Sequence, residues 1–324
     1  MNPTILVLAA GMSTRYGRSK QLEPLGPSGE TLVDYAVFDA LRAGFSRVVL
    51  VIREELEEAF RDELLPRWPR ELEVLFHRQR ADDIPVSEPR DGVEALIHAR
   101  EKPWGTAHAV LTARGLLPGP FVVLNADDFY GPSAYARAMA FLREEAPGRV
   151  AGNGRPVFAL VAYTLRETLS RHGGVNRGLC RVSEDGWLQE VREVLDLHPE
   201  EGEVRGRTLG GGAVSLTGEE PISTNFWVFT PEVFPLLEEG FRAFLARELE
   251  EGGPGLVGGG SEFLIPTEVN RLLQEGAVRV QVPRATDPFF GITHPQDREG
   301  VVRGLGRLAR DGCYPDPLWE ESCN

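Results

Sequence analysis

A short apolar strand leads into a loop of small residues and cations at the start of the chain. The run Ile5–Leu8 is too short to cross a membrane and is typical of a buried strand. Three residues with little side chain follow, which lets a ligand approach the backbone N–H groups: Ala9, Ala10 and Gly11. Three cations come next within one short loop: Arg15, Arg18 and Lys20. The stretch predicts a cradle for an anion such as a phosphate, and an ordinary tight turn from strand to helix is the alternative.

Two neighbouring carboxylates follow a second apolar run. The residues Phe121–Asn125 predict a buried strand, and Asp127 and Asp128 come directly after it. Polar groups at the carboxyl end of a strand lie where open α/β sheets bind their ligands. Because side chains alternate along a strand, we expect one carboxylate to face the site and the other to cap the helix that begins near Pro132.

A third segment combines a lysine with a glycine at the start of a predicted helix. Lys102 is followed closely by Gly105 and Thr106, which open a helix over residues 106–114. The chain has 35 lysines and arginines, and its two lysines, Lys20 and Lys102, both lie in candidate motifs, where a compact ammonium group is useful. The alternative is an ordinary helix start in which Gly105 or Thr106 caps free N–H groups.

Together these segments resemble the nucleotidyltransferases that make nucleotide-sugars and related activated metabolites. The sequence Gly11-Met12-Ser13-Thr14-Arg15, followed by Ser19-Lys20, resembles their motif G-x-G-T-R and P-K, with serines at the second glycine and at the proline. The segment Pro103–Ala107 resembles their second motif, and Asp127–Gly131 resembles their aspartate, asparagine or aspartate, and Tyr-Gly turn. The resemblance is specific over the first 130 residues and looser beyond them.

The resemblance implies a role for each matching residue. It implies that Arg15 and Lys20 are catalytic, and that Asp127 binds Mg²⁺, for which a carboxylate is a suitable ligand. It implies nucleotide contacts from two short segments: Ala9, Ala10 and Gly11, and Lys102, Gly105 and Thr106. Lys102, Gln79 and the region of Gly105 are the candidates for selecting the base. It also implies that Glu193 and Asn225 bind the acceptor, with a solvated glutamate at a strand end as the alternative for Glu193.

The second half departs from the family pattern at two places. Val194 and Leu195 replace the Lys-Pro that follows the acceptor-binding glutamate in the family motif. Another cation must then bind the acceptor phosphate, and Arg177 and Arg192 are the candidates. The segment from Asp287 to Asp297 resembles the motif W-x-D-I-G-T-P-E-D, which supplies a second metal aspartate, but Gly291 stands at the aspartate position. Asp287 or Asp297 can compensate, although Asp297 is better placed to cap the helix over 298–309. The second metal ligand is therefore open.

Composition argues against several classes of function. The net charge of −14 argues against a nucleic-acid partner, so an anionic substrate must be held by a local cluster of cations. Three cysteines without C-x-x-C spacing suit a reducing cytoplasm: Cys180, Cys313 and Cys323. No signal peptide or long apolar run is recognisable, so we expect a cytoplasmic protein without a membrane partner. The sequence carries no signal for the oligomeric state.

Alternating helices and strands must position these residues. Apolar runs predict further strands at 48–52, 72–76, 157–163, 179–182, 188–194, 223–229 and 278–282. Amphipathic stretches predict helices over 32–43, 54–65, 231–247, 262–273 and 298–309. We expect a mobile loop at 78–94, a Gly-rich and charged excursion at 200–218, and a flexible connection at 252–260. The order favours an α/β fold with a Rossmann-like, open, mostly parallel mixed sheet and helices on both faces.

We expect one domain whose halves bind the two substrates. Residues 1–250 form the nucleotidyltransferase core, with an NTP-binding half at about 1–135 and an acceptor-binding half at 136–250. Residues 251–324 complete the same domain.

The predicted function is transfer of a nucleoside monophosphate from an NTP to a phosphorylated acceptor, with release of pyrophosphate. A sugar-1-phosphate is the favoured acceptor, because the aromatic-rich second half suits a ring. The first alternative is a non-sugar acceptor of the phosphocholine, methylerythritol phosphate or molybdopterin type. The second is a sensing domain that binds nucleotide or nucleotide-sugar and has lost the chemistry, which the missing aspartate at position 291 supports.

Overall fold

The computed structural model describes most of the 324-residue chain. It covers residues 3–11, 14–15, 18–86, 93, 97, 100, 102–144, 154–250 and 261–319, with the backbone alone for 14–15 and 18–19. The predicted connection at 252–260 and most of the predicted loop after residue 86 lie outside the described residues. No helix in these ranges is long and apolar enough to span a membrane.

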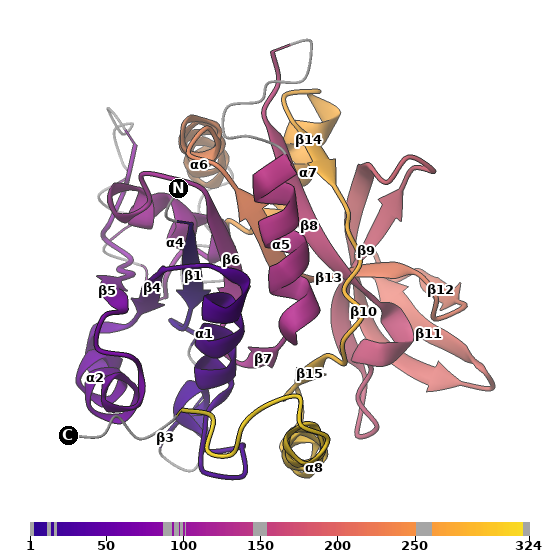
Figure 1. Ribbon diagram of the computed structural model, residues 1–324. Helices are drawn as coiled ribbons and strands as arrows, with labels where there is room; N and C mark the ends of the chain where they lie inside the picture. Colours follow the sequence, from indigo (N-terminus) through magenta and orange to yellow (C-terminus); the bar gives the residue numbers. More distant parts are fainter. Residues whose placement is uncertain are drawn as a thin grey trace.

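Four parallel strands form the N-terminal half of the sheet (Figure 1). They lie in the order β5 (Glu73–Arg78), β4 (Arg47–Ile52), β1 (Thr4–Leu8) and β6 (Phe121–Asn125). Val48–Ile52 and Phe121–Leu124 are buried throughout, as expected for parallel strands that are covered on both faces. Their apolar runs therefore predicted them correctly as strands.

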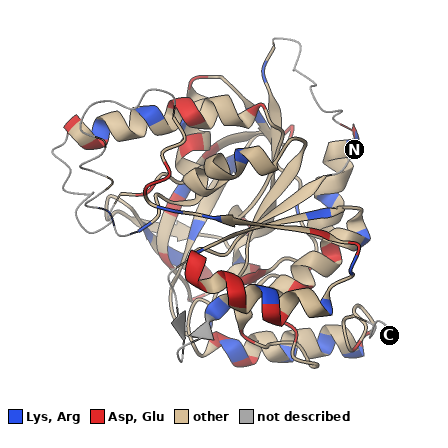
Figure 2. Ribbon diagram, turned by 90° about the vertical axis from the view of Figure 1, so that its left-hand side faces the viewer, with Lys and Arg blue, Asp and Glu red and all other residues tan. Residues whose placement is uncertain are grey.

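Helices cover both faces of the sheet (Figure 2). On one face α1 (Leu32–Ala43), α2 (Glu57–Leu64) and α5 (Pro132–Glu144) pack against Ile5, Val7 and their neighbours. On the other face α4 (Thr106–Thr112), α6 (Val233–Glu250) and α7 (Ile265–Gln274) pack against Leu6, Val49 and Val123. Because successive side chains of a strand point to opposite faces of the sheet, each strand contributes residues to two separate hydrophobic cores. The predicted α/β class with a mixed sheet and helices on both faces is confirmed.

The first helix begins and ends at residues that the sequence makes clear. Thr31 is the N-cap of α1: its hydroxyl accepts from the Asp34 amide at 3.2 Å, and the Asp34 carboxylate accepts from the Thr31 amide at 2.8 Å. This reciprocal arrangement satisfies two backbone donors that a helix start leaves unpaired. Gly44 ends the helix with a φ of 102°, a left-handed conformation that glycine adopts without strain.

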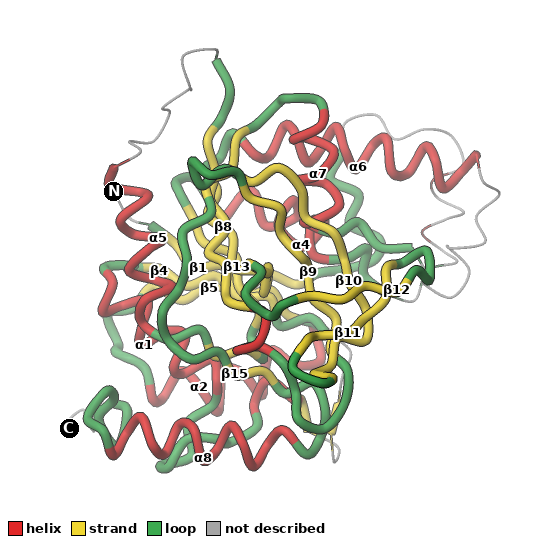
Figure 3. Tube along the Cα trace, turned by 90° about the vertical axis from the view of Figure 1, so that its right-hand side faces the viewer, coloured by secondary structure: helices red, strands yellow, loops and turns green. Residues whose placement is uncertain are grey.

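The second half of the sheet is antiparallel. Strand β13 (Pro221–Phe229) lies beside β6 and also pairs with β8 (Val157–Thr164) and β9 (Val175–Val182). The sheet then continues through β10 (Leu188–Glu200), β11 (Glu203–Thr208) and β12 (Ala213–Leu216). These strands extend away from the helical layers in Figure 1 and lie toward the viewer in Figure 3. Residues 200–218 are therefore two paired strands rather than an irregular excursion. Their alternating exposed side chains and turn glycines hid them from a search for apolar runs.

The C-terminal elements return to both parts of the sheet. Strand β14 (Arg279–Gln281) lies parallel to β8, and β15 (Phe290–Gly291) pairs with β7 (Asp128–Phe129), close to the predicted site. Helix α8 (Asp297–Arg310) is seen end-on at the bottom of Figure 1 and runs along the lower edge in Figure 3. Its Val301 and Leu305 share a core with Leu32 and Tyr35 of α1.

Short elements complete the described chain. They are β2 (Thr14–Arg15) and β3 (Arg18–Ser19), which pair with each other, and the 3-10 turns η1 (Lys20–Leu22), η2 (Glu54–Leu56), η3 (Leu65–Arg67), η4 (Ala113–Leu116) and η5 (Leu165–Thr168).

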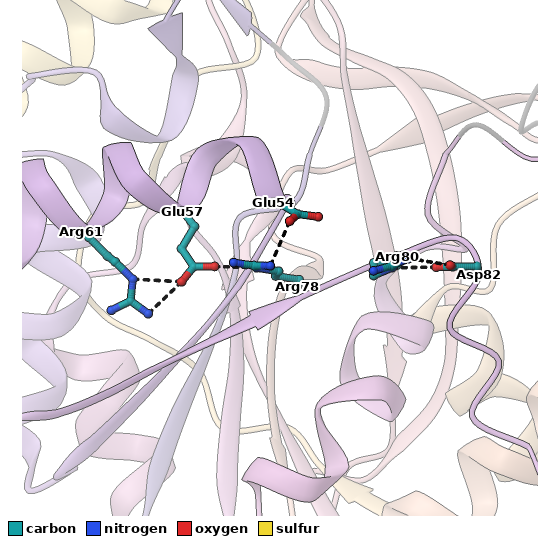
Figure 4. Close-up of polar contacts among 6 residues, drawn as sticks. All are labelled: Glu54, Glu57, Arg61, Arg78, Arg80 and Asp82. Atoms are coloured by element: carbon teal, nitrogen blue, oxygen red, sulfur yellow. Dashed lines mark hydrogen bonds and ion pairs between the residues drawn. The ribbon is translucent and has the colours of Figure 1, made fainter.

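A cluster of charged side chains links α2 to β5 on the surface (Figure 4). Glu57 accepts hydrogen bonds from Arg61 at 2.8 Å and from Arg78 at 2.7 Å, and Arg78 also reaches Glu54 at 3.0 Å. The hydrogen bond from Arg78 is the main reason why the pKa of Glu57 is lowered. Exposed pairs of this kind contribute little to the stability of a fold.

Candidate active site

The carboxyl ends of the parallel strands meet at one edge of the sheet. Leu8, the last residue of β1, is in register with Val51 of β4 on one side and with Asn125 of β6 on the other. The segments that follow these strands are therefore neighbours, although β1 and β6 lie more than 100 residues apart in the sequence. Open α/β sheets bind their ligands at this edge.

A cleft of about 400 Å³ opens at this edge. Most of its residues come from the end of β1 and the loop after it, from the segment that leads into α4 and α4 itself, and from the end of β6 and the turn after it. The lining residues are Leu8, Ala10, Gly11, Gln21, Val51, Gln79, Lys102, Pro103, Gly105, Thr106, Ala109, Asn125, Asp127 and Glu262. We call it the first cleft. A volume of this size accommodates a small-molecule ligand.

Lys20 and Asp127 meet at the first cleft. The Lys20 ammonium nitrogen lies 2.5 Å from Oδ2 of Asp127, and their side chains are 10% and 31% exposed. Lys20 begins η1, directly after the β2–β3 pair, and Asp127 lies in the turn after β6. The pair therefore joins the opening loop to the end of another strand, 107 residues away in the sequence.

The backbone of the opening loop turns back on itself before Lys20. Thr14 pairs with Ser19, and Arg15 pairs with Arg18. The side chain of Arg15 lies outside the described part of the structure, so its predicted role stays a prediction.

The three small residues after β1 divide between the core and the cleft. Ala9 is fully buried, and its amide donates to the carbonyl of Val51 at 2.8 Å. The expectation of a bare amide is therefore wrong for Ala9, because the parallel sheet continues one residue beyond β1. Ala10 and Gly11 line the first cleft.

Glycine is required at position 105 by the backbone opposite. Gly105 has a φ of 110°, and a Cβ built there would lie 2.7 Å from the carbonyl oxygen of Phe263. That same oxygen accepts from the Ala107 amide at 3.0 Å, and the Thr106 hydroxyl accepts from the Ile265 amide at 3.1 Å. The segment before α7 thus lies against the start of α4 and brings Glu262 to the cleft.

Gln79 has a fixed orientation in the first cleft. The side-chain nitrogen of Gln79 lies 3.0 Å from the Gly105 carbonyl oxygen and 3.1 Å from Nδ1 of His108. Nε2 of His108 lies 2.7 Å from the carbonyl of Asp83, which can only accept, so Nε2 carries the proton and Nδ1 accepts. Burial lowers the pKa of His108 to about 4, which keeps the ring neutral.

Asp128 belongs to a hydrogen-bonded network beside Asp127. Its Oδ2 accepts from the Asn125 side chain at 2.9 Å, and the Asn225 side chain donates to Oδ1 of Asn125 at 2.8 Å. Trp227 in turn donates to Oδ1 of Asn225 at 3.1 Å. Burial, and then the neighbouring charge of Asp127, raise the pKa of Asp128 to about 7. Asn225, which adopts a φ of 66°, is thus held within the network and does not line the first cleft.

The predicted capping role of the aspartate pair is wrong, because Asp287 performs it. Oδ2 of Asp287 accepts from the Ser133 amide at 2.5 Å, in the first turn of α5. Asp297 is the first residue of α8: it accepts from Ser170 at 2.6 Å and from the His294 amide at 2.7 Å. Both aspartates that we considered as substitutes for residue 291 therefore have structural partners.

A second cleft, of about 450 Å³, opens between η5, the start of β9, β15 and α8. It is lined by Arg166, Glu167, Thr168, Leu169, Ser170, Arg171, His172, Val175, Arg177, Phe289, Phe290, Gly291, Thr293, Asp297, Gly300, Val301 and Arg303. Its four arginines outnumber its two carboxylates. Glu193 lies on β10 and pairs in register with Gly178 of β9, the residue after Arg177. Burial raises the pKa of Glu193, and the charge of Arg177 offsets only part of that rise.

Sequence reasoning missed several residues of the first cleft. Asn125 carried a signal, because it is the last residue of a predicted strand at the ligand-binding edge. Gln21 and Glu262 carried none, because turn η1 and the segment before α7 reach the cleft only through the tertiary fold.

Solved structures of low sequence identity share the fold of this chain. A search of curated proteins found no match. The inositol-1-phosphate CTP transferase from T. maritima shares the fold, with a TM-score of 0.56 and 15% identity over 94% of this chain and 96% of that chain. A UDP-glucose pyrophosphorylase from Acinetobacter baumannii also shares it, with a TM-score of 0.56 and 14% identity over 97% of this chain and 99% of that chain.

The family comparison covers both residues of the Lys20–Asp127 pair. The family model of the MobA-like NTP transferase domain matches residues 5–194, which is more than half of the chain. The match includes the opening loop, the start of α4 and the turn after β6, the segments that form most of the first cleft. The chain therefore belongs to the family of MobA-like NTP transferases.

Proposed function

We propose that the protein transfers a nucleoside monophosphate from an NTP to a phosphorylated acceptor, a sugar-1-phosphate being the favoured one, and releases pyrophosphate. The Lys20–Asp127 pair at the first cleft is the observation that carries this proposal. A cation and a carboxylate at the ligand-binding edge of the sheet are the groups that phosphoryl chemistry needs, because it depends on neutralising and aligning two anions.

The cations take separate parts in this reaction. Lys20 binds the attacked phosphate and the acceptor together; its 2.5 Å contact with Asp127, which lines the first cleft, supports this role. The guanidinium group of Arg15 donates two hydrogen bonds to oxygens of the triphosphate and stabilises the leaving pyrophosphate. No general base is needed, because the phosphate oxygen of the acceptor is already ionised at neutral pH.

The nucleotide lies in the first cleft. Ala10 and Gly11 present backbone to the phosphates, while Gly105, Thr106 and Lys102 also line the cleft and contact the nucleotide. The oxygen of the Gln79 amide is left to face a ligand, because its nitrogen is committed to Gly105 and His108. Gln79 thus offers a hydrogen-bond acceptor to the base of the nucleotide.

The residues present fit a magnesium ion. Asp127 offers a partly exposed carboxylate at the cleft, and Mg²⁺ binds one or two protein carboxylates together with substrate phosphates. Within the described residues there is no group of three or more His, Cys, Asp or Glu side chains of the kind that holds a transition metal. When bound, such an ion would draw negative charge from the α-phosphate. Lys20 would bind the substrate phosphates in place of Asp127.

The second cleft is the proposed acceptor site. Arg177 is half-buried there, lies 5.6 Å from the ring of Phe289, and supplies the cation that the missing Lys of the acceptor motif would have provided. Glu193, close to Arg177, binds hydroxyl groups of the acceptor. Asn225 supports the site through Asn125 rather than by contact.

We further propose a cytoplasmic location and small-molecule partners only. The buried Cys180 and the exposed Cys313 are both free thiols, which suits a reducing compartment. The net charge of −14 does not favour nucleic acid.

Pyrophosphate release across a panel of substrates tests the proposal. The panel combines four NTPs and Mg²⁺ with several sugar-1-phosphates, phosphocholine, methylerythritol phosphate and a molybdopterin. Release with one NTP and one sugar-1-phosphate is the expected result. Turnover with a non-sugar acceptor alone would correct the acceptor class. Nucleotide binding without turnover across the whole panel would contradict the proposal and favour a sensor.

A further inference from the structure

A carboxylate oxygen occupies the place in which a side chain at position 291 would begin. Gly291 of β15 lies opposite Asp128 of β7 in the register of that strand pair. A Cβ built on Gly291 would lie 2.8 Å from Oδ1 of Asp128. In an aspartate, the carboxylate oxygens stand about 2.4 Å from their own Cβ by standard bond lengths. Oδ1 of Asp128 therefore lies about as far from the Cβ position of residue 291 as the carboxylate oxygens of an aspartate there would lie from their own Cβ.

The Asp128 carboxylate is anchored through one oxygen and leaves the other available. Asn125 donates to Oδ2 at 2.9 Å, and Asn225 orients Asn125 from the next strand. The Tyr130 hydroxyl is 3.5 Å from Oδ2 and has a better acceptor in the Thr224 carbonyl at 3.0 Å. Among the described residues, the hydrogen bonds to this carboxylate all go to Oδ2, and Oδ1 has none.

The position of Asp128 lies between the two clefts. Its partner Asn125 lines the first cleft, and Gly291 lines the second. The preceding residue, Asp127, lines the first cleft and contacts Lys20. The other two candidates for a second carboxylate are used elsewhere, since Asp287 caps α5 and Asp297 joins Ser170 to the start of α8.

We propose that Asp128 supplies the second carboxylate of the magnesium site, through Oδ1, in the place that Gly291 leaves open. The inference rests on the proposed function, since it assigns a ligand to the metal of that reaction. Asn125 and Asn225 act as positioning residues, because they hold the carboxylate through its other oxygen. The glycine at position 291 is then a requirement of the site and not a sign that the chemistry has been lost.

Metal binding, followed without turnover, tests this assignment. Mn²⁺ replaces Mg²⁺ and is titrated into the full-length protein, with free Mn²⁺ measured by electron paramagnetic resonance. Asp128→Asn keeps the shape and the contact with Asn125 but loses the charge, so its Mn²⁺ dissociation constant should rise at least about tenfold. Asp127→Asn should show a similar rise. Thermal unfolding of each variant checks that the fold is retained.

Moving the carboxylate provides the sharper variant. Asp128→Gly combined with Gly291→Asp returns a carboxylate to the same space from the opposite strand, so Mn²⁺ affinity should recover to within about threefold of the wild type, against a loss of at least about tenfold in Asp128→Gly alone. Gly291→Ala removes no ligand but displaces Oδ1 of Asp128, so it should also weaken Mn²⁺ binding, while the open Gly119→Ala should not.

Two results would overturn the assignment. One is an Asp128→Asn variant that binds Mn²⁺ like the wild type, and the other is a combined variant that binds no better than Asp128→Gly. If Asp127→Asn nevertheless lost both Mn²⁺ and turnover, the proposed function would stand and only this inference would fail. If the Mn²⁺ dissociation constants change as expected but the wild type releases no pyrophosphate, the proposed function would be rejected and the metal site would stand.

Discussion

At the residue scale, the two aspartates after β6 show what one sequence can and cannot specify. The opening loop and the turn after β6 were both recognisable, because small residues, cations and carboxylates followed apolar runs. The position of Asp128 was not, since only the pairing of β7 with β15 places it against Gly291. Asp287 replaced the aspartate pair as the cap of α5 for the same reason: it arrives from 154 residues away.

Another buried carboxylate, outside the site, makes stability depend on pH. Asp39 of α1 is 1% exposed, accepts from the Tyr314 hydroxyl at 2.6 Å, and has no described hydrogen-bond partner for Oδ1. Burial raises its pKa from 3.8 to about 7. In the folded state Asp39 is therefore protonated at pH 5, where the unfolded chain is already ionised.

Replacing Asp39 should flatten this pH dependence. A carboxyl group whose folded pKa is raised contributes stability below its unfolded pKa and loses it as pH rises through the folded value. The wild type should therefore lose stability between about pH 4 and pH 7, by about 1.4 kcal/mol per pH unit at most, relative to Asp39→Asn. Urea unfolding at several pH values measures the difference. Parallel profiles of the two proteins would contradict the prediction.

At the element scale, the central elements were predictable and the edge strands were not. Strands β1, β4 and β6 are buried on both faces, so each appears in the sequence as an unbroken apolar run. Strands β11 and β12 expose alternate residues at the end of the sheet, and their glycines and charges suggested an irregular segment. The helices were predicted to within a few residues because their apolar positions recur on one face.

The start of α4 depends on the segment before α7. A methyl group on Gly105 would lie 2.7 Å from the Phe263 carbonyl oxygen, at a φ that other residues rarely adopt. Gly105→Ala should therefore push this segment away, raise the KM for the NTP by about tenfold or more, and destabilise the fold by about 1–3 kcal/mol. Steady-state kinetics and thermal unfolding measure the two effects.

Gly115→Ala is the matched control, because a Cβ at that position meets no atom within 4 Å. It should leave the KM for the NTP and the unfolding temperature near those of the wild type. Equal effects of the two substitutions would show that the contact between Gly105 and Phe263 does not shape the cleft.

At the scale of the whole molecule, we propose that residues 251–324 complete the domain formed by residues 1–250. Strand β14 extends the sheet beside β8, β15 pairs with β7, and Glu262 lines the first cleft. Helices α7 and α8 bury Ile265, Val269 and Leu305 against the rest of the chain. Within the core, the NTP-binding half is then the parallel part of the sheet, and the acceptor-binding half is the antiparallel part.

Removing the C-terminal segment should destroy the fold. A chain that ends at residue 250 leaves β8, α1 and α6 without the apolar surfaces that cover them, so we expect no cooperative thermal unfolding and no NTP binding. Calorimetry of the truncated and full-length chains makes the comparison. A truncated chain that unfolds cooperatively and binds NTP would show that residues 251–324 form a separate unit.

The rate of pyrophosphate release by Lys20→Ala and Asp127→Ala, measured beside the wild type with the most active substrate pair, tests the central claim most directly. Both variants should retain the circular dichroism spectrum of the wild type. Their turnover should fall by about 10²–10³, as expected when one electrostatic contact to the reacting phosphates is lost. Near-normal release by either variant would remove that residue from the mechanism and contradict the account.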